Sequence, residues 1–251
     1  MRIVVIGGTG LIGSKVVNGL TEHGHDAVAT APSTGVNTLT GEGLAEVLKG
    51  ANAVIDVSNS PTLDGAAKQF FHTATTNLLE AEAAAGVTHH VALSVIGTDR
   101  MAQESEYFEG KQIQEKLISS GPVPYTIVHA TQFFEFVGTI ADSATVDGAV
   151  RLPNAFIQPM ASADVAEAVA IAAVNDPVNG IIEVGGPERF RMPDLIRIAL
   201  TAHADTREVV VDPDAGYWGV QIAQTTLVPG DDATLFDIRF SDWVSEAAAR
   251  A

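Results

Sequence analysis

Length, composition and charge limit the kind of protein that this chain can be. Its 251 residues are 46% hydrophobic and include no cysteine, so a substantial core is possible, whereas disulfides and cysteine-based zinc sites are excluded. The formal net charge of −17 disfavours nucleic acid as a partner, because phosphate backbones would be repelled. No apolar run is long enough for a membrane span and no signal-peptide layout is present. We therefore expect a cytoplasmic protein with no nucleic-acid or membrane partner.

The first thirteen residues, MRIVVIGGTGLIG, are the most informative stretch of the chain. Residues 3–6 are apolar and β-branched, which is typical of a strand buried on both faces. Residues 11–20 then predict a helix. A glycine-rich turn between such a strand and helix is the setting in which glycines indicate dinucleotide binding. The alternative interpretation is a tight turn that binds nothing.

Each glycine of the turn has a predicted role. Gly7 permits the tight turn, Gly10 leaves the backbone open to a pyrophosphate, and Gly13 lets the helix pack closely on the strand. The backbone N–H groups at the helix start, including those of Leu11 and Ile12, would hold the anion together with the helix dipole.

The first 130 residues alternate between strand and helix signals. The predicted strands are residues 26–30, 53–57, 91–95 and 125–128, and the predicted helices are residues 44–48, 64–85 and 105–119. This alternation predicts an α/β fold with a Rossmann-type, doubly wound parallel sheet.

The pattern loosens beyond residue 140. Short strands are expected at residues 149–152 and 181–184, and helices at residues 164–174 and 193–202. We expect a single NAD(P)-binding domain over residues 1–251, in which residues 150–251 form most of a small C-terminal substrate-binding lobe.

Tyr107 and Lys111 form the second informative feature. They are four residues apart, so on a helix they share one face. A nearby ammonium stabilises a phenolate, and we therefore expect Lys111 to lower the pKa of Tyr107 and to donate to a ribose hydroxyl. The alternative is an incidental pair on an exposed helix.

Ser94 lies near the carboxyl end of the strand predicted at residues 91–95, where ligands bind in open α/β sheets. Its hydroxyl could donate to a carbonyl oxygen while Tyr107 exchanges the proton. The alternative is a serine that only ends the strand.

Cofactor preference is determined after the second strand, where the sequence is TAPSTG over residues 30–35. No carboxylate is present there to bind a ribose 2′-hydroxyl, and Ser33 could donate to a 2′-phosphate, so NADP(H) is favoured over NAD(H). Ser58 and Asn59 follow the strand at residues 53–57 and are expected along the ribose and pyrophosphate.

The chain resembles the short-chain dehydrogenase/reductase superfamily in three features: the turn GGTGLIG, Ser94 and the pair Tyr107/Lys111. Two further segments resemble its atypical NmrA-like branch: NLLEAEAAAGVTHHVALS and PYTIVHATQFFEF. The resemblance covers about residues 1–175. It implies NAD(P) binding on a Rossmann fold. It also implies that Ser94 polarises a carbonyl, Tyr107 donates the proton and Lys111 binds the ribose. Asn77 matches a position where the superfamily often carries asparagine, although a packing role is at least as good an interpretation.

The sequence departs from these relatives at His129, which stands where they usually carry an arginine. His129 either faces the cofactor or is a histidine at a strand end whose hydrogen bonds are made within the protein. Many NmrA-like proteins have lost the tyrosine and act as cofactor-binding regulators, whereas this chain keeps Tyr107.

Aromatic residues at Phe133, Phe134 and Phe156 suggest an apolar substrate pocket, with core packing as the alternative for each. His89 and His90 are adjacent in a predicted strand and so face opposite sides, which argues against a shared metal; no metal site is expected.

The sequence thus predicts an NAD(P)H-dependent oxidoreductase acting on a small, fairly apolar carbonyl or alcohol. A non-catalytic NmrA-like redox sensor is the alternative. A nucleotide-sugar epimerase or dehydratase is disfavoured by the short C-terminal part. The oligomeric state is left open.

Overall fold

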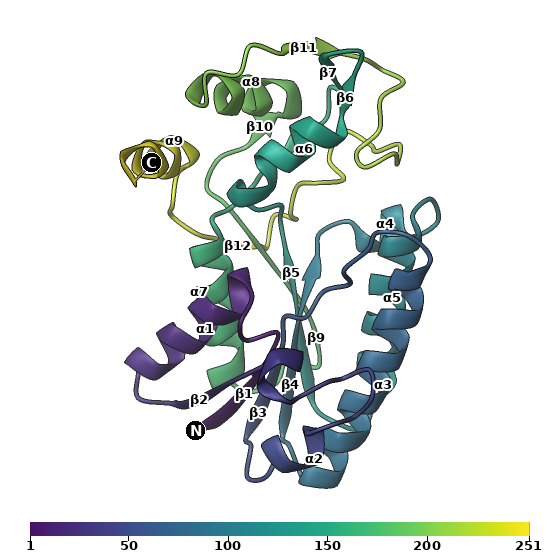
Figure 1. Cartoon of the computed structure of the whole chain (residues 1–251), viewed down its shortest axis with the longest axis vertical. Helices are drawn as coiled ribbons and strands as arrows, with labels where there is room; N and C mark the ends of the chain where they lie inside the picture. Colours follow the sequence, from purple (N-terminus) through teal and green to yellow (C-terminus); the bar gives the residue numbers. More distant parts are fainter. Residues whose placement is uncertain (251) are drawn as a thin grey trace. The chain divides into compact units, whose positions relative to one another are not determined.

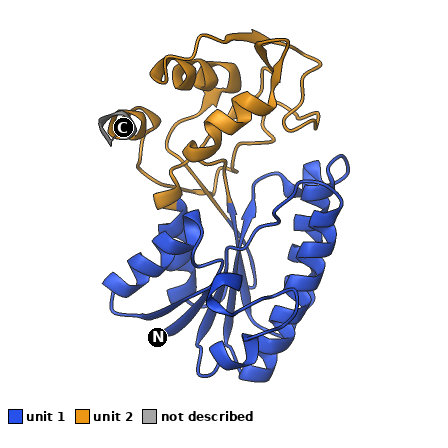
Figure 2. Ribbon diagram, in the orientation of Figure 1, with its two compact units in different colours: residues 1–129, 165–182 blue, residues 130–164, 183–251 orange. Residues whose placement is uncertain are grey.

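The computed structural model describes residues 1–250, and the side chains of residues 1–246. The chain forms two compact units, shown in Figure 2. Unit 1 comprises Met1–His129 and Val165–Ile182, and unit 2 comprises Ala130–Asp164 and Glu183–Ala251. Among the described residues, every helix is too short or too polar to cross a membrane.

The central feature of the fold is a seven-stranded sheet with the order β12-β9-β5-β4-β3-β1-β2. Its strands are β1 (Arg2–Ile6), β2 (Asp26–Thr30), β3 (Ala53–Asp56), β4 (His89–Val95), β5 (Tyr125–Ala130), β9 (Gly180–Gly185) and β12 (Thr234–Leu235). β1 pairs in parallel with β2 and β3, and β3 with β4. Ile3, Val4 and Val5 of β1 are fully buried, which confirms the prediction of a strand covered on both faces.

Helices cover both faces of the sheet. Figure 1 shows α1 (Leu11–Glu22) and α7 (Ser162–Val174) on one face, and α3 (Ala66–Ala85) and α5 (Glu106–Ser120) on the other. Short helical segments, η1 (Pro32–Thr34), α2 (Leu44–Val47) and α4 (Thr98–Met101), complete the connections. The predicted doubly wound Rossmann-type fold is therefore confirmed.

β1 marks the point where the strand order reverses. β2 lies on one side of β1 and β3 lies on the other. In open parallel sheets, ligands bind outside the carboxyl ends of the strands at such a reversal. The residues that follow Ile6 and Asp56 therefore border the expected binding crevice.

Helices α3 and α5 pack unusually closely because Gly110 has no side chain. A Cβ atom at Gly110 would lie 2.9 Å from Cδ2 of Phe71 and 3.1 Å from the carbonyl oxygen of Ala67. The ring of Phe71 also makes edge contact with Tyr107 and lies under the ammonium of Lys111. Glycine at position 110 lowers the stability of helix α5 relative to alanine. In return, it lets α3 pack against both residues of the Tyr107/Lys111 pair.

Unit 2 is built from shorter elements. They are η2 (Phe134–Phe136), α6 (Val137–Ser143), β6 (Thr145–Val146), β7 (Ala149–Leu152), β8 (Phe156–Ile157), β10 (Phe190–Arg191), α8 (Met192–Ala202), β11 (Glu208–Val211) and α9 (Phe240–Arg250). β6, β7 and β11 form one small sheet, and β8 and β10 form an antiparallel ribbon. The ring of Phe134 packs against those of Phe240 and Trp243 in an aromatic cluster.

The two adjacent histidines of β4 have separate partners, in agreement with their predicted opposite orientation. His89 Nε2 lies 2.9 Å from the hydroxyl of Thr126. His90 Nδ1 lies 2.8 Å from Oε1 of Glu82, and both side chains of this pair are fully buried. Burial alone would lower the pKa of His90, but the carboxylate of Glu82 outweighs it and raises that pKa. Burial raises the pKa of Glu82.

Replacing His90 by leucine is expected to destabilise unit 1 strongly, because it leaves the buried carboxylate of Glu82 without its partner. The expected loss is about 3–5 kcal/mol of unfolding free energy at pH 7. An acid whose pKa is raised in the folded state stabilises the fold at low pH and loses that contribution as the pH rises. The loss should therefore be smaller at pH 5 than at pH 7 in urea unfolding.

The double variant Glu82→Leu/His90→Leu is the control for this experiment. It removes both charges and should recover much of the loss. A loss below about 1 kcal/mol for His90→Leu at both pH values would contradict an ion pair in the core.

Candidate functional site

The glycine turn after β1 has the geometry that its sequence predicts. Gly7 has a φ of 78°, and a Cβ atom there would lie 3.0 Å from the backbone nitrogen of Ser58. A Cβ atom at Gly13 would lie only 2.2 Å from the carbonyl oxygen of Gly7, so α1 could not pack on the turn with any larger residue. At Gly10 a Cβ atom would meet the Gly7 carbonyl oxygen at 3.3 Å and, within the described structure, otherwise open space.

The start of α1 presents backbone donors beside that open space. Gly10 is the N-cap and makes no side-chain cap. The first intrahelical bond runs from the Ser14 N–H to the Gly10 carbonyl at 3.0 Å, so the N–H groups of Leu11, Ile12 and Gly13 precede it. Such uncapped N–H groups and the helix dipole form an anion-binding site. These residues fit the pyrophosphate of a dinucleotide cofactor.

The loop after β3 lies against this turn and is held by the buried carboxylate of Asp56. Oδ1 of Asp56 accepts hydrogen bonds from the backbone N–H of Ser58 at 2.9 Å and from its hydroxyl at 2.6 Å. Oδ2 accepts from Nε2 of Gln114 at 3.0 Å. Asp56 thus ties the loop that borders Gly7 to helix α5.

Lys111 continues this buried network. Its Nζ donates to the carbonyl oxygen of Leu93 at 2.8 Å and to Oε1 of Gln114 at 2.5 Å. The side chain is 3% exposed, and burial lowers its pKa to about 8, although the charges of Asp56 and Glu115 oppose the change. Two of its three N–H donors are therefore used inside the protein.

Tyr107 points to the loop after β3. Its hydroxyl donates to Oδ1 of Asn59 at 2.9 Å. The expectation that Lys111 lowers the pKa of Tyr107 is wrong for this structure, because burial raises that pKa to about 12 and the ammonium of Lys111 is directed to Leu93 and Gln114. At neutral pH the phenol of Tyr107 is therefore protonated.

Ser94 belongs to a cluster that sequence analysis did not anticipate. Its hydroxyl donates to Oε1 of Glu115 at 2.5 Å, and Nε2 of His129 lies 2.9 Å from the same oxygen. Burial would raise the pKa of Glu115, but the bonds and charge of His129, the Ser94 hydroxyl and the charge of Lys111 outweigh it and lower that pKa. Tyr107, Lys111 and Glu115 are spaced by four residues, and this periodicity could have identified Glu115.

Two other predicted residues lie in unit 1, Ser33 on η1 and Asn77 on α3. Ser33 is exposed on η1, whereas its neighbour Thr34 is bonded to the backbone of Ala31. Asn77 donates to the carbonyl oxygens of Thr38 and Leu39, which supports the packing interpretation of this side chain.

The three predicted substrate-binding phenylalanines occupy three different environments in unit 2. Phe134 is 2% exposed within the aromatic cluster, so the structure corrects its expected role to core packing. Phe133 stacks on the exposed ring of Phe136. Phe156 is partly buried and lies against arginine side chains.

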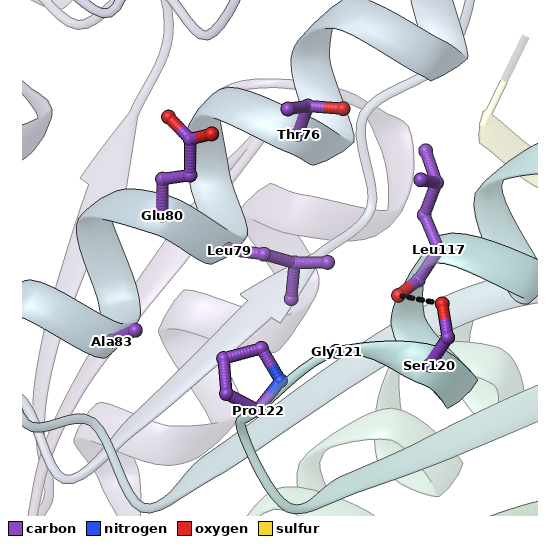
Figure 3. A pocket seen from close by; sticks show the side chains of 8 residues that line it. All are labelled: Thr76, Leu79, Glu80, Ala83, Leu117, Ser120, Gly121 and Pro122. Atoms are coloured by element: carbon purple, nitrogen blue, oxygen red, sulfur yellow. Dashed lines mark hydrogen bonds between the residues drawn. The ribbon is translucent and has the colours of Figure 1, made fainter.

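A separate groove runs between the C-terminal parts of α3 and α5 and is shown in Figure 3. It is lined by Thr76, Leu79, Glu80, Ala83, Leu117, Ser120, Gly121 and Pro122. Tyr107 lies near the opposite end of α5. The groove is therefore distinct from the crevice at the carboxyl ends of the strands.

The fold and the glycine turn together define an NAD(P)-binding Rossmann protein of the short-chain dehydrogenase/reductase type. A family model described as NAD(P)H-binding matches residues 7–177. The chain belongs to this NAD(P)H-binding family.

Two curated proteins are similar in sequence. A (4-alkanoyl-5-oxo-2,5-dihydrofuran-3-yl)methyl phosphate reductase of Streptomyces griseus is 29% identical over 68% of this chain and 62% of its own length. A photosystem II assembly factor of Synechocystis is 27% identical over 54% of this chain and 46% of its own length. The chain thus spans less than two thirds of either relative.

Solved structures share the fold. A short-chain dehydrogenase/reductase superfamily protein of Agrobacterium tumefaciens with bound NAD has a TM-score of 0.72 at 17% identity, covering 99% of this chain and 96% of its own. A UDP-N-acetylglucosamine 4-epimerase of Bacillus cereus has a TM-score of 0.68 at 17% identity, covering 100% and 98%. At these identities the likeness extends to the fold alone.

Replacing Gly10 by valine is expected to weaken NADPH binding at least tenfold while the protein stays folded. The new Cβ atom enters the open space beside the first N–H groups of α1, and among the described residues it meets only the Gly7 carbonyl oxygen within 4 Å. A fluorescence titration with NADPH measures the affinity, and urea unfolding measures stability.

Two variants of α1 complete this test. Gly19→Ala is the matched control, because a Cβ atom there meets no described atom within 4 Å, so affinity should be unchanged. Gly13→Ala should lose stability, because its Cβ would collide with the Gly7 carbonyl oxygen. Wild-type NADPH affinity in Gly10→Val would show that the anion site is placed wrongly.

Proposed function

We propose that the chain is an NAD(P)H-dependent oxidoreductase that interconverts a small, fairly apolar carbonyl compound and its alcohol. The observation that carries this proposal is the hydrogen bond between the Tyr107 hydroxyl and Asn59. It brings a protonated phenol to the loop that borders the glycine turn, where we expect the cofactor to bind.

When bound, the nicotinamide cofactor supplies the hydride. The protein supplies the proton, and Tyr107 is the group that holds it. Because burial raises the pKa of Tyr107 to about 12, the phenol is protonated at neutral pH and suits the direction of carbonyl reduction. The Asn59 oxygen aligns the hydroxyl before a substrate oxygen takes its place as acceptor.

Lys111 and Ser94 have supporting roles in this proposal. Lys111 is a buried cation on the same face of α5 as Tyr107, and we assign its third N–H donor to a ribose hydroxyl of the cofactor. Ser94 donates its single hydroxyl proton to Glu115, so polarising a carbonyl requires this hydroxyl to rotate toward the substrate. His129 holds Glu115 from the other side.

The sequence relatives give limited support to the reaction class. One of them is a reductase by its printed name, and the chain covers 62% of it. The retention of Tyr107 in a bonded position in the crevice supports catalysis over a purely cofactor-sensing role.

Replacing Tyr107 by phenylalanine is expected to lower turnover by about 10²–10⁴, the range typical of one general acid. NADPH affinity should stay nearly unchanged, because the ring and the backbone donors of α1 remain. Steady-state rates on a panel of small carbonyl compounds measure turnover, and fluorescence measures binding.

The matched control is Tyr125→Phe, which removes a tyrosine hydroxyl at the start of β5 and should leave both quantities unchanged. Lys111→Met should impair turnover and cofactor affinity together. Full activity in Tyr107→Phe would reduce the tyrosine to a packing role.

NADPH is expected to bind more tightly than NADH, because the segment after β2 carries no carboxylate and exposes Ser33. Calorimetry with both cofactors tests this preference, and Ser33→Ala should weaken NADPH binding but not NADH binding. A Kd tenfold lower for NADH, about 1.4 kcal/mol, would reverse the assignment.

A further inference from the structure

The antiparallel ribbon of β8 and β10 in unit 2 has two chemically different faces. Arg191 pairs with Phe156, and Phe190 pairs with Ile157. Because side chains alternate along a strand, Arg191 and Phe156 share one face, whereas Phe190 and Ile157 share the other. Phe190 packs on Phe240 and Ile157 is fully buried, so the core lies on their side. The Arg191/Phe156 face is the outward one.

Two guanidinium groups lie against the ring on that face. Cζ of Arg191 is 3.7 Å from the centroid of Phe156, and Cζ of Arg189 is 5.9 Å from it. Stacking on an aromatic face attracts each cation to the ring and restricts the rotamers of both arginines. The two cations are therefore held on one side of the ribbon before any ligand arrives.

Neutral oxygens, not carboxylates, hold these two arginines. Nη1 of Arg191 donates to the carbonyl oxygen of Asn154 at 2.9 Å and to Oε1 of Gln224 at 2.5 Å. Nε of Arg189 donates to Oε1 of Gln158 at 3.3 Å. An arginine has five N–H donors, so this arrangement fixes each side chain without consuming its charge or most of its donors.

The other arginines whose side chains the structure describes are different, because each forms an ion pair. They are Arg2, Arg100, Arg151, Arg197, Arg207 and Arg239. The chain carries 31 acidic residues against 14 lysines and arginines, so carboxylates are abundant. Arg189 and Arg191, held by neutral acceptors, are thus an exception among the described arginine side chains of an acidic protein.

We propose that Arg189 and Arg191, positioned by Phe156, form a binding site for a phosphate group. The planar fork of a guanidinium matches the oxygens of a phosphate and can bind it in a bidentate way. Two adjacent forks suit a dianion better than a single carboxylate. The phosphate is either free in solution or part of an organic phosphate ester.

A phosphate site would also narrow the substrate class of the proposed oxidoreductase, and this part of the inference rests on the proposed function. If the ester is the substrate of the oxidoreductase, the substrate carries a phosphate beside its carbonyl or alcohol and is less apolar than the phenylalanines alone suggest. The phosphate site itself is a property of unit 2 and can be measured without turnover.

Calorimetric titration of the whole chain at low ionic strength tests the site, with inorganic phosphate, ethyl phosphate and acetate as probes. Arg189→Gln/Arg191→Gln is expected to weaken phosphate binding at least tenfold. Arg197→Gln is the matched control, because it removes the same charge from a unit 2 arginine that is paired with Asp194, and it should leave binding unchanged. Repeating the titrations in Gly10→Val separates this site from phosphate bound at the start of α1.

The three probes distinguish the sources of the phosphate. Tighter binding of ethyl phosphate than of inorganic phosphate, lost in the double variant, supports an ester ligand, and the reverse order supports free phosphate. Equal binding of acetate, equal loss in Arg197→Gln, or no loss in the double variant would overturn the proposal. Absence of reductase activity with intact arginine-dependent phosphate binding would refute the proposed function and leave this site standing.

Discussion

The buried carboxylate of Asp56 is the constraint on which the rest of the candidate site depends. It holds the Ser58 loop with one oxygen and, through Gln114, helix α5 with the other. The same loop approaches Gly7 so closely that only glycine fits there, and Asn59 within it bonds Tyr107. One hydrogen-bonded carboxylate therefore links the cofactor turn to the predicted proton donor.

Burial shifts the pKa values of Tyr107 and Lys111 more than the charge of any neighbour does. Tyr107 and Lys111 share a helix face, but their shifts follow desolvation: the pKa of the phenol rises to about 12 and that of the ammonium falls to about 8. Both changes favour the neutral forms. At neutral pH the phenol of Tyr107 is therefore protonated, and Lys111 lies closer to deprotonation than an exposed lysine does.

The parts of the fold that sequence predicts are those fixed by local pattern. The strand at residues 3–6 and the glycine turn could be predicted because their residues determine their own conformation. β8 and β10 are two residues long and carry no periodicity, so they could not be predicted. Phe134 was expected to face substrate because its partners Phe240 and Trp243 are about a hundred residues away in sequence.

The same limit applies to the site. Tyr107 and Lys111 were identified from their spacing, but their partners come from other strands and loops, and only the folded chain shows that Ser94 donates to Glu115.

The central claim is that the start of α1 and the hydroxyl of Tyr107 border one cofactor crevice. Titrating NADP⁺ into ¹⁵N-labelled protein, with backbone amide shifts followed by NMR, tests it most directly. We expect the amides of Gly10–Gly13 and of Asn59 to shift most and to follow the same saturation curve. Shifts confined to other parts of the chain, or different saturation curves for the two loops, would contradict it.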